Sequence, residues 1–142
     1  MNLTKVKEKL LKMGERIGMK VQEENAEQIT LDAQVSAKGY FEKALYMRVV
    51  VYESGTLHMF LTFNQLEKTY DNLFLINAFN SENPWFRAYI SNLNGKDYLE
   101  LHYASFALEN EDETTLTVAY LLNELLTENT LKYLKPILKA DK

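Results

Sequence analysis

LFLINAFNSENPWFRAYI, residues 73–90, changes its hydrophobic period halfway along. Its first half places apolar residues at helical spacing, and Asp71 or Asn72 offers a side-chain acceptor for the amides of the first turn. Pro84 then ends the helix, because proline disfavours the helical conformation of the residue before it. The second half alternates with a period of two, which predicts a strand after the turn. One side of this predicted strand carries Trp85, Arg87 and Tyr89.

Two asparagines, Asn77 and Asn80, interrupt the apolar surface of the predicted helix. Asparagine is a poor helix former, and its amide is costly to bury without hydrogen-bond partners. Because buried polar groups are nearly always hydrogen-bonded, the pair predicts amide bonds to the neighbouring turn that hold helix and strand together. Contact with a ligand is the alternative interpretation.

The composition is that of one globular domain over residues 1–142, with 46% hydrophobic and 25% charged residues. A net charge of −4 argues against nucleic-acid binding, which requires clustered lysine and arginine. There is no cysteine, and no apolar run approaches the roughly 18 residues of a membrane span. We therefore expect a soluble, cytoplasmic protein that binds neither nucleic acid nor membrane.

The clearest predicted hairpin joins residues 44–52 to residues 56–63 through a turn at Gly55. One side of both strands is almost entirely aliphatic, which predicts a core-facing surface. The other side is too aromatic for an ordinary solvent-facing surface, so either a flap of the same chain covers it or it contacts a partner. This second side carries Tyr46, Arg48, Val50, Tyr52, His58, Phe60 and Thr62.

The remaining elements follow from the same periodicities. An amphipathic helix is predicted over residues 2–17, followed by strands at 19–22 and 29–35 and a loop at 36–43. Asn94–Gly95 predicts a tight hairpin turn before a strand over residues 97–108. The last helix starts in an acidic cluster at residues 110–113 and is interrupted near residues 127–130. The predicted order is α-β-β-β-β-α-β-β-α, an α+β fold in which helices pack on an antiparallel sheet.

Catalytic and metal-binding patterns are missing from the sequence. His58 and His102 are the only histidines; each is predicted in mid-strand, without a partner that would orient it as a general base. Neither has a second ligand at metal-binding spacing, and five scattered glycines form no phosphate-binding loop. We therefore expect a non-enzymatic protein with no catalytic residue, no metal site and no cofactor.

The residues Ile76-Asn77-Ala78-Phe79-Asn80, followed by the strand Phe86-Arg87-Ala88-Tyr89-Ile90, resemble the YbjN-like family. The resemblance covers residues 44–138, whereas only the order of elements agrees before that. The chain departs from the pattern at residues 103–108, which lack the acidic or glycine-containing start expected for the last helix. The family in turn resembles class I chaperones of type III secretion in fold.

This resemblance implies a regulatory or chaperone-like homodimer that holds a partner protein or peptide on sheet or helix surfaces. Capture of an extended segment needs exposed strand edges and apolar pockets, which the predicted hairpin supplies. The candidate contact residues are Tyr46, Val50, Tyr52 and Phe60, followed by Trp85, Arg87 and Tyr89.

Two other functions remain open from the sequence. One is a small-molecule site between the hairpin and the helices. Its predicted ring of residues is Tyr52, His58, Phe60 and Tyr98. The other is an inhibitor or immunity-type protein whose acidic surface masks a basic enzyme, since net charge favours partners of opposite sign.

Overall fold

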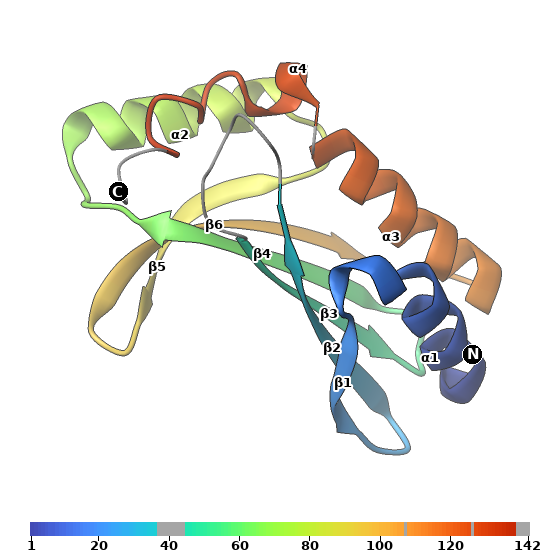
Figure 1. The fold of residues 1–142 in the computed structure, drawn as a ribbon. Coiled ribbons are helices and arrows are strands. Elements are labelled where there is room, and N and C mark those ends of the chain that lie inside the picture. Colours follow the sequence, from blue (N-terminus) through green and yellow to red (C-terminus); the bar gives the residue numbers. More distant parts are fainter. Residues whose placement is uncertain (37–44, 107, 126, 139–142) are drawn as a thin grey trace.

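Six antiparallel strands form one sheet, and helices cover one of its two faces (Figure 1). The structure is a computed structural model that describes residues 1–36, 45–106, 108–125 and 127–138. The predicted α+β class and order of elements are confirmed, while most of the predicted loop at 36–43 lies outside the described residues. In chain order the elements are α1 (Leu3–Met13), the short 3-10 helix η1 (Glu15–Ile17), β1 (Lys20–Glu24), β2 (Gln28–Val35), β3 (Leu45–Tyr52), β4 (Leu57–Gln65), α2 (Tyr70–Glu82), β5 (Arg87–Leu93), β6 (Lys96–Ser105), α3 (Glu111–Leu125) and α4 (Glu128–Leu131).

The strands lie in the order β1-β2-β3-β4-β6-β5, so β1 and β5 form the two edges of the sheet. Tight turns join β3 to β4 and β5 to β6, as the sequence predicted. Asn94 and Gly95 both have positive φ, the conformation that a two-residue hairpin turn requires. Gly55, in the other turn, lies against the backbone of Leu108. A Cβ added at Gly55 would stand 2.5 Å from the carbonyl oxygen of Leu108.

The core lies between the helices and the aliphatic side of the strands. Alternate residues of the strands are completely or almost completely buried there, because side chains on a strand point to opposite faces in turn. The strand residues are Ile29, Leu31, Met47, Val49, Leu57, Met59, Leu61, Leu99 and Leu101. The helices and the C-terminal turns pack Val6, Leu10, Ile76, Phe79, Val118, Leu121, Leu131, Leu134 and Leu138 against them.

The start of α2 differs from the prediction. Thr69, and not Asp71 or Asn72, is the N-cap, and its hydroxyl oxygen accepts a hydrogen bond from the backbone N–H of Asn72. Threonine supplies the same kind of acceptor, and its extended backbone makes the turn into the helix two residues before Asp71. Asn72 instead donates its amide to the carbonyl of Glu67.

The last helix is interrupted as predicted, but the break lies between Leu125 and Glu128, and residues 128–130 of the predicted break belong to α4. At the start of α3, the side chain of Asn110 accepts from the N–H of Glu113, whose carboxylate in turn accepts from the N–H of Glu109. This reciprocal cap explains why the acidic cluster stands at this end of the helix.

Candidate functional site

Within the part of the chain that the structure describes, the second face of the sheet carries no helix, and we call it the open face (Figure 1). Its side chains form rows that run across the strands, because directly opposed residues of an antiparallel sheet share a face. The central row is Asp32, Arg48, Phe60, His102 and Arg87, and the row beside it is Gln34, Tyr46, Thr62, Glu100 and Tyr89. The row on the other side is Thr30, Val50, His58 and Ala104. The alternative of a flap over this face is therefore not seen among the described residues.

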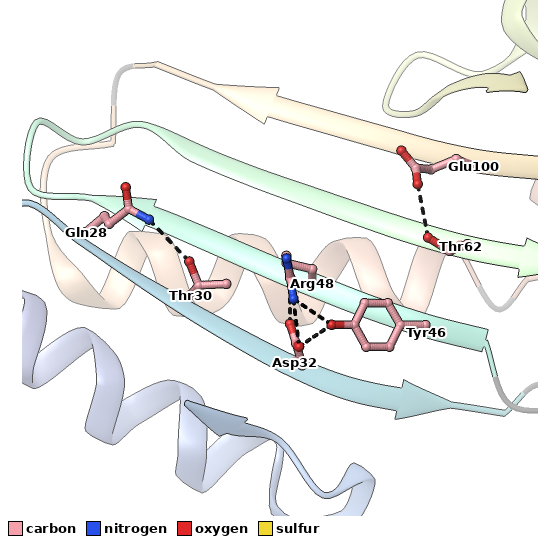
Figure 2. Close-up of polar contacts among 7 residues, drawn as sticks. All are labelled: Gln28, Thr30, Asp32, Tyr46, Arg48, Thr62 and Glu100. Carbon is pink, nitrogen blue, oxygen red and sulfur yellow. Dashed lines mark hydrogen bonds and ion pairs between the residues drawn. The ribbon is translucent and has the colours of Figure 1, made fainter. Parts of the chain in front are cut away.

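A buried carboxylate is paired at one end of the central row (Figure 2). Asp32 accepts hydrogen bonds from Nε and Nη2 of Arg48, at 2.8 and 3.0 Å, and a further one from the hydroxyl of Tyr46. Burial acts to raise the pKa of Asp32, but the hydrogen bonds from Arg48 and Tyr46 outweigh it and hold the pKa below its usual range. The pKa of Tyr46 is raised by burial and by the adjacent carboxylate. The three side chains thus form a neutral, preorganised group.

A second carboxylate lies in the neighbouring row and is also paired. Glu100 accepts from the hydroxyl of Thr62 at 3.0 Å and from the hydroxyl of Tyr89 (Figure 2 shows the bond from Thr62). Burial and this carboxylate raise the pKa of Tyr89, which keeps its phenol protonated. Thr62, Glu100 and Tyr89 come from β4, β6 and β5, so the bonds tie three adjacent strands together.

Beside these polar groups lies an aromatic patch, which we define as Tyr52, His58, Phe60, His102 and Phe106. The rings of Phe60 and His102 stack with centroids 4.6 Å apart, and His58 stacks on both of them. Tyr52 and Phe106 approach His58 edge-on. Phe106 is 72% exposed, and the rest of the patch is half-buried although no helix covers it. Aromatic side chains offer large contact areas and are enriched in the cores of protein interfaces.

The two histidines of the patch are hydrogen-bonded to each other. Nδ1 of His58 and Nε2 of His102 lie 2.9 Å apart, so one nitrogen donates and the other accepts. Burial and the neighbouring His58 lower the pKa of His102, and the carboxylate of Glu100 opposes them only in part. At neutral pH His102 is therefore expected to be uncharged.

The open face brings together six of the seven predicted contact residues. Tyr46, Val50, Tyr52, Phe60, Arg87 and Tyr89 all lie on it, although Val50 is 9% exposed and offers little surface.

The placement of Trp85 beside Arg87 was wrong. The strand begins only at Arg87, because the side chain of Asn83 accepts from the N–H groups of Trp85 and Phe86 and holds both in the turn.

Trp85 lies on the helix side of the molecule. Its ring meets that of Tyr120 on α3 edge-on, with centroids 5.6 Å apart. Together with Tyr103 and Leu116 the two rings line a shallow depression of about 610 Å³ whose rim carries Asp112 and Glu113.

The two asparagines of α2 have different roles. Asn80 accepts from the N–H of Ala88 at 2.6 Å and donates to the carbonyl of the same residue at 2.9 Å. The predicted link between helix and strand is thus confirmed for Asn80. It was wrong for Asn77, which is exposed and has no such bond among the described residues.

Helix α2 also leaves a second set of apolar side chains in solvent. Tyr70, Leu73 and Phe74 are 86, 41 and 64% exposed, while Ile76 and Phe79 on the opposite side are buried. The helix is therefore apolar around most of its circumference.

Several residues of the open face were not identified from the sequence as contact residues. Glu100 and His102 join it through the pairing of β6 with β4, which are separated in sequence by α2 and β5. Asp32 joins it through the pairing of β2 with β3, and Phe106 continues it beyond β6. The predicted ring of a small-molecule site does not form. Tyr98 lies six positions along β6 from Ala104, the residue opposite His58.

Among the residues that the structure describes, no three His, Cys, Asp or Glu side chains cluster as metal ligands. Within the same residues no helix is both long and apolar enough to cross a membrane. Comparison with known proteins adds no relative, since no protein-family model, no curated protein and no solved structure matches the chain.

Proposed function

We propose that this protein is a non-enzymatic binding module that holds an extended segment of a partner polypeptide on its open face. The observation that carries the proposal is the aromatic patch, whose stacked rings lie uncovered at the centre of a sheet face. An aromatic surface that is fixed in advance loses little side-chain entropy when a partner covers it.

The electrostatics of the open face favour the same function. Asp32 and Glu100 already have hydrogen-bond partners, so a partner polypeptide that covers them need not supply new ones. Burying a carboxylate whose hydrogen bonds are already made costs less than burying one without partners. The face therefore combines an apolar centre with polar surroundings, which is the usual anatomy of a protein interface.

Arg87 indicates which side chains the partner segment should carry. It is exposed, and it stands directly opposite His102 at the border of the aromatic patch. A segment with aromatic or aliphatic side chains for the patch and a carboxylate for Arg87 would satisfy both features. The resemblance to YbjN-like proteins implies the same kind of function, and it stays a prediction, as does a cytoplasmic location.

Selection from a displayed random-peptide library tests the proposal. The enriched peptides are expected to contain apolar and acidic residues, and their binding should shift amide resonances of β3, β4 and β6. Phe60→Glu should weaken the binding of these peptides by more than about tenfold, because it places a negative charge in the patch beside the carboxylates of Asp32 and Glu100.

Leu116→Glu is the matched control, since it adds the same charge at an exposed apolar position on α3. This variant should bind the peptides as well as the wild type does. Circular dichroism establishes that both variants are folded. Failure to enrich any peptide, or enrichment of peptides that bind Phe60→Glu equally well, would refute the proposal.

A small-molecule function has one specific observation in its favour, the depression beside Trp85. Trp85 is the only tryptophan, so its fluorescence reports on this depression alone. A planar aromatic ligand that bound here would quench the fluorescence and raise the melting temperature, and Tyr120→Ala would weaken both effects. A compound library without any such ligand would exclude this second candidate.

A further inference from the structure

The two edge strands of the sheet differ in how they are protected. β1 is a poor template for another strand, because three of its five residues are charged and its pairing is irregular between Val21 and Glu23. β5 has a single charged residue, Arg87, at its start, and is uncharged from Tyr89 to Leu93.

One position of the β5 edge is blocked by the protein itself. The side chain of Asn80 makes hydrogen bonds with both the N–H and the C=O of Ala88, as the backbone of a neighbouring strand would. Ala88 therefore directs its backbone groups away from β6 and toward the outer edge.

The next outward positions along β5 are open. In an antiparallel ladder every second residue exchanges both hydrogen bonds with its partner strand, so Ile90 and Asn92 point outward as Ala88 does. Within the described part of the chain, no side chain or backbone group bonds to the outward N–H and C=O of either residue. The hairpin that carries them projects away from the helices (Figure 1).

We propose that the β5 edge pairs with the β5 edge of a second copy of this chain, antiparallel and centred on Ser91. In this register Ile90 lies opposite Asn92 of the second copy, and each such pair exchanges both of its backbone hydrogen bonds. The two-fold axis repeats the pair, so the outward N–H and C=O groups of Ile90 and Asn92 are hydrogen-bonded in both copies.

The length of the free edge selects a second copy over another partner. The next outward position is Ala88, and opposite it the strand of the second copy has ended in its Asn94–Gly95 turn. Asn80 therefore blocks the edge at the place where a second copy has nothing to add. The uncharged stretch from Tyr89 to Leu93 also avoids the repulsion that any charged patch exerts on its own copy.

Pairing in this way makes one continuous sheet from two copies. Tyr89 of one copy then stands beside Leu93 of the other, and both belong to the open-face side of β5. The two open faces become one surface, although this inference does not depend on what that surface binds.

A single engineered cysteine tests the register, since the chain has none of its own. Ser91 would lie opposite its own copy in a non-hydrogen-bonded pair, with Cα atoms about 4.5 Å apart, within the range of a disulfide. Ser91→Cys should oxidise to a covalent dimer at low protein concentration. Gln22→Cys on β1 is the matched control and should remain a monomer on a non-reducing gel.

A proline substitution tests the hydrogen bonds. Asn92→Pro removes an outward N–H and leaves the backbone hydrogen bonds to β6 in place, and it should weaken the dimer by about tenfold or more in light scattering. The side-chain bond from Asn92 to Asp97 is lost in this variant and in the alanine control alike. Asn92→Ala keeps that N–H and should leave the mass at two chains. The mass of a single chain for the wild type at high concentration would overturn the proposal. A dimer that survives Asn92→Pro and fails to cross-link through Ser91→Cys would also overturn it, because another surface would then be responsible.

Discussion

The two faces of the sheet are built from the same strands, but their side chains are stabilised in different ways. On the covered face, aliphatic side chains such as Leu61 and Leu101 are fully buried against helices and need no polar partner. On the open face, Phe60 and His102 lie half-buried without a helix, stacked on each other. The buried carboxylates of this face are held by side chains from adjacent strands. The comparison shows that alternation assigns a residue to a face, whereas cross-strand neighbours decide whether it can remain uncovered.

The largest expected difference between the faces is in stability. Leu61→Ala should lower the free energy of unfolding by about 2–5 kcal/mol, because it leaves a cavity in a closely packed core. Phe60→Ala, one residue earlier on the opposite face, should cost no more than about 1 kcal/mol from lost cross-strand contacts. Denaturant unfolding of both variants measures the difference. Equal losses would mean that the open face is packed as firmly as the core.

The second-largest loss of stability is expected at the link between α2 and β5. Asn80→Ala should destabilise the protein by about 1–3 kcal/mol, since it leaves the N–H and C=O of Ala88 without their partners. Asn77→Ala, on the exposed side of the same helix, should stay within about 0.5 kcal/mol of the wild type. Chemical denaturation distinguishes the two. A similar cost for both would contradict the different roles of the two amides.

The paired carboxylate of the open face makes a smaller contribution. Arg48→Met should raise the pKa of Asp32, because it removes two hydrogen bonds and the adjacent positive charge. The expected cost in stability is about 1 kcal/mol, since the arginine side chain is 44% exposed and solvent screens the pair.

The sign of the pH effect follows from the lowered pKa of Asp32. Its stabilisation is present above the unfolded value of 3.8 and is lost as the pH falls through the folded pKa. Carbon-detected NMR titration of Asp32 in both proteins measures the change. An unshifted pKa in Arg48→Met would show that Tyr46 alone holds the carboxylate.

The histidine pair should give the smallest effect. Because the folded pKa of His102 lies below the unfolded value of 6.5, the unfolded chain binds more protons as the pH falls below neutrality. The free energy of unfolding is therefore expected to decrease as the pH falls through 6.5 toward the lower folded pKa. His102→Gln removes this titration and should make the decrease shallower. Urea unfolding at a series of pH values measures it, and parallel curves would contradict it.

The fold was predictable because each element has a local signal. The period change around Pro84, the Asn94–Gly95 turn and the alternation of β3 and β4 identified elements that the structure contains. The start of α2 was misplaced because Thr69, Asp71 and Asn72 all offer short side-chain acceptors. Only the extended backbone of Thr69 decides between them.

The candidate site was only partly predictable. Alternation placed Tyr46, Phe60 and Tyr89 on the correct face, since that depends on neighbouring residues alone. The bond between His58 and His102 depends on the pairing of β4 with β6, and these residues are 44 positions apart. Trp85 was misplaced for a local reason, because the bonds from its turn to Asn83 delay the start of the strand.

The strand order also has a kinetic consequence. The strands β1, β2, β3 and β4 follow one another both along the chain and across the sheet, and a tight hairpin joins β5 to β6. Each half of the sheet can therefore form between strands that are consecutive in sequence. Among the described strands, the pairing of β4 with β6 is the one that must close a loop containing a whole helix, α2. We call this pairing the seam. Such long-range pairings form slowly, because the loop between the strands loses conformational entropy before any contact is gained. We expect the formation of this seam, where Leu61 meets Leu101, to set the rate at which the chain folds.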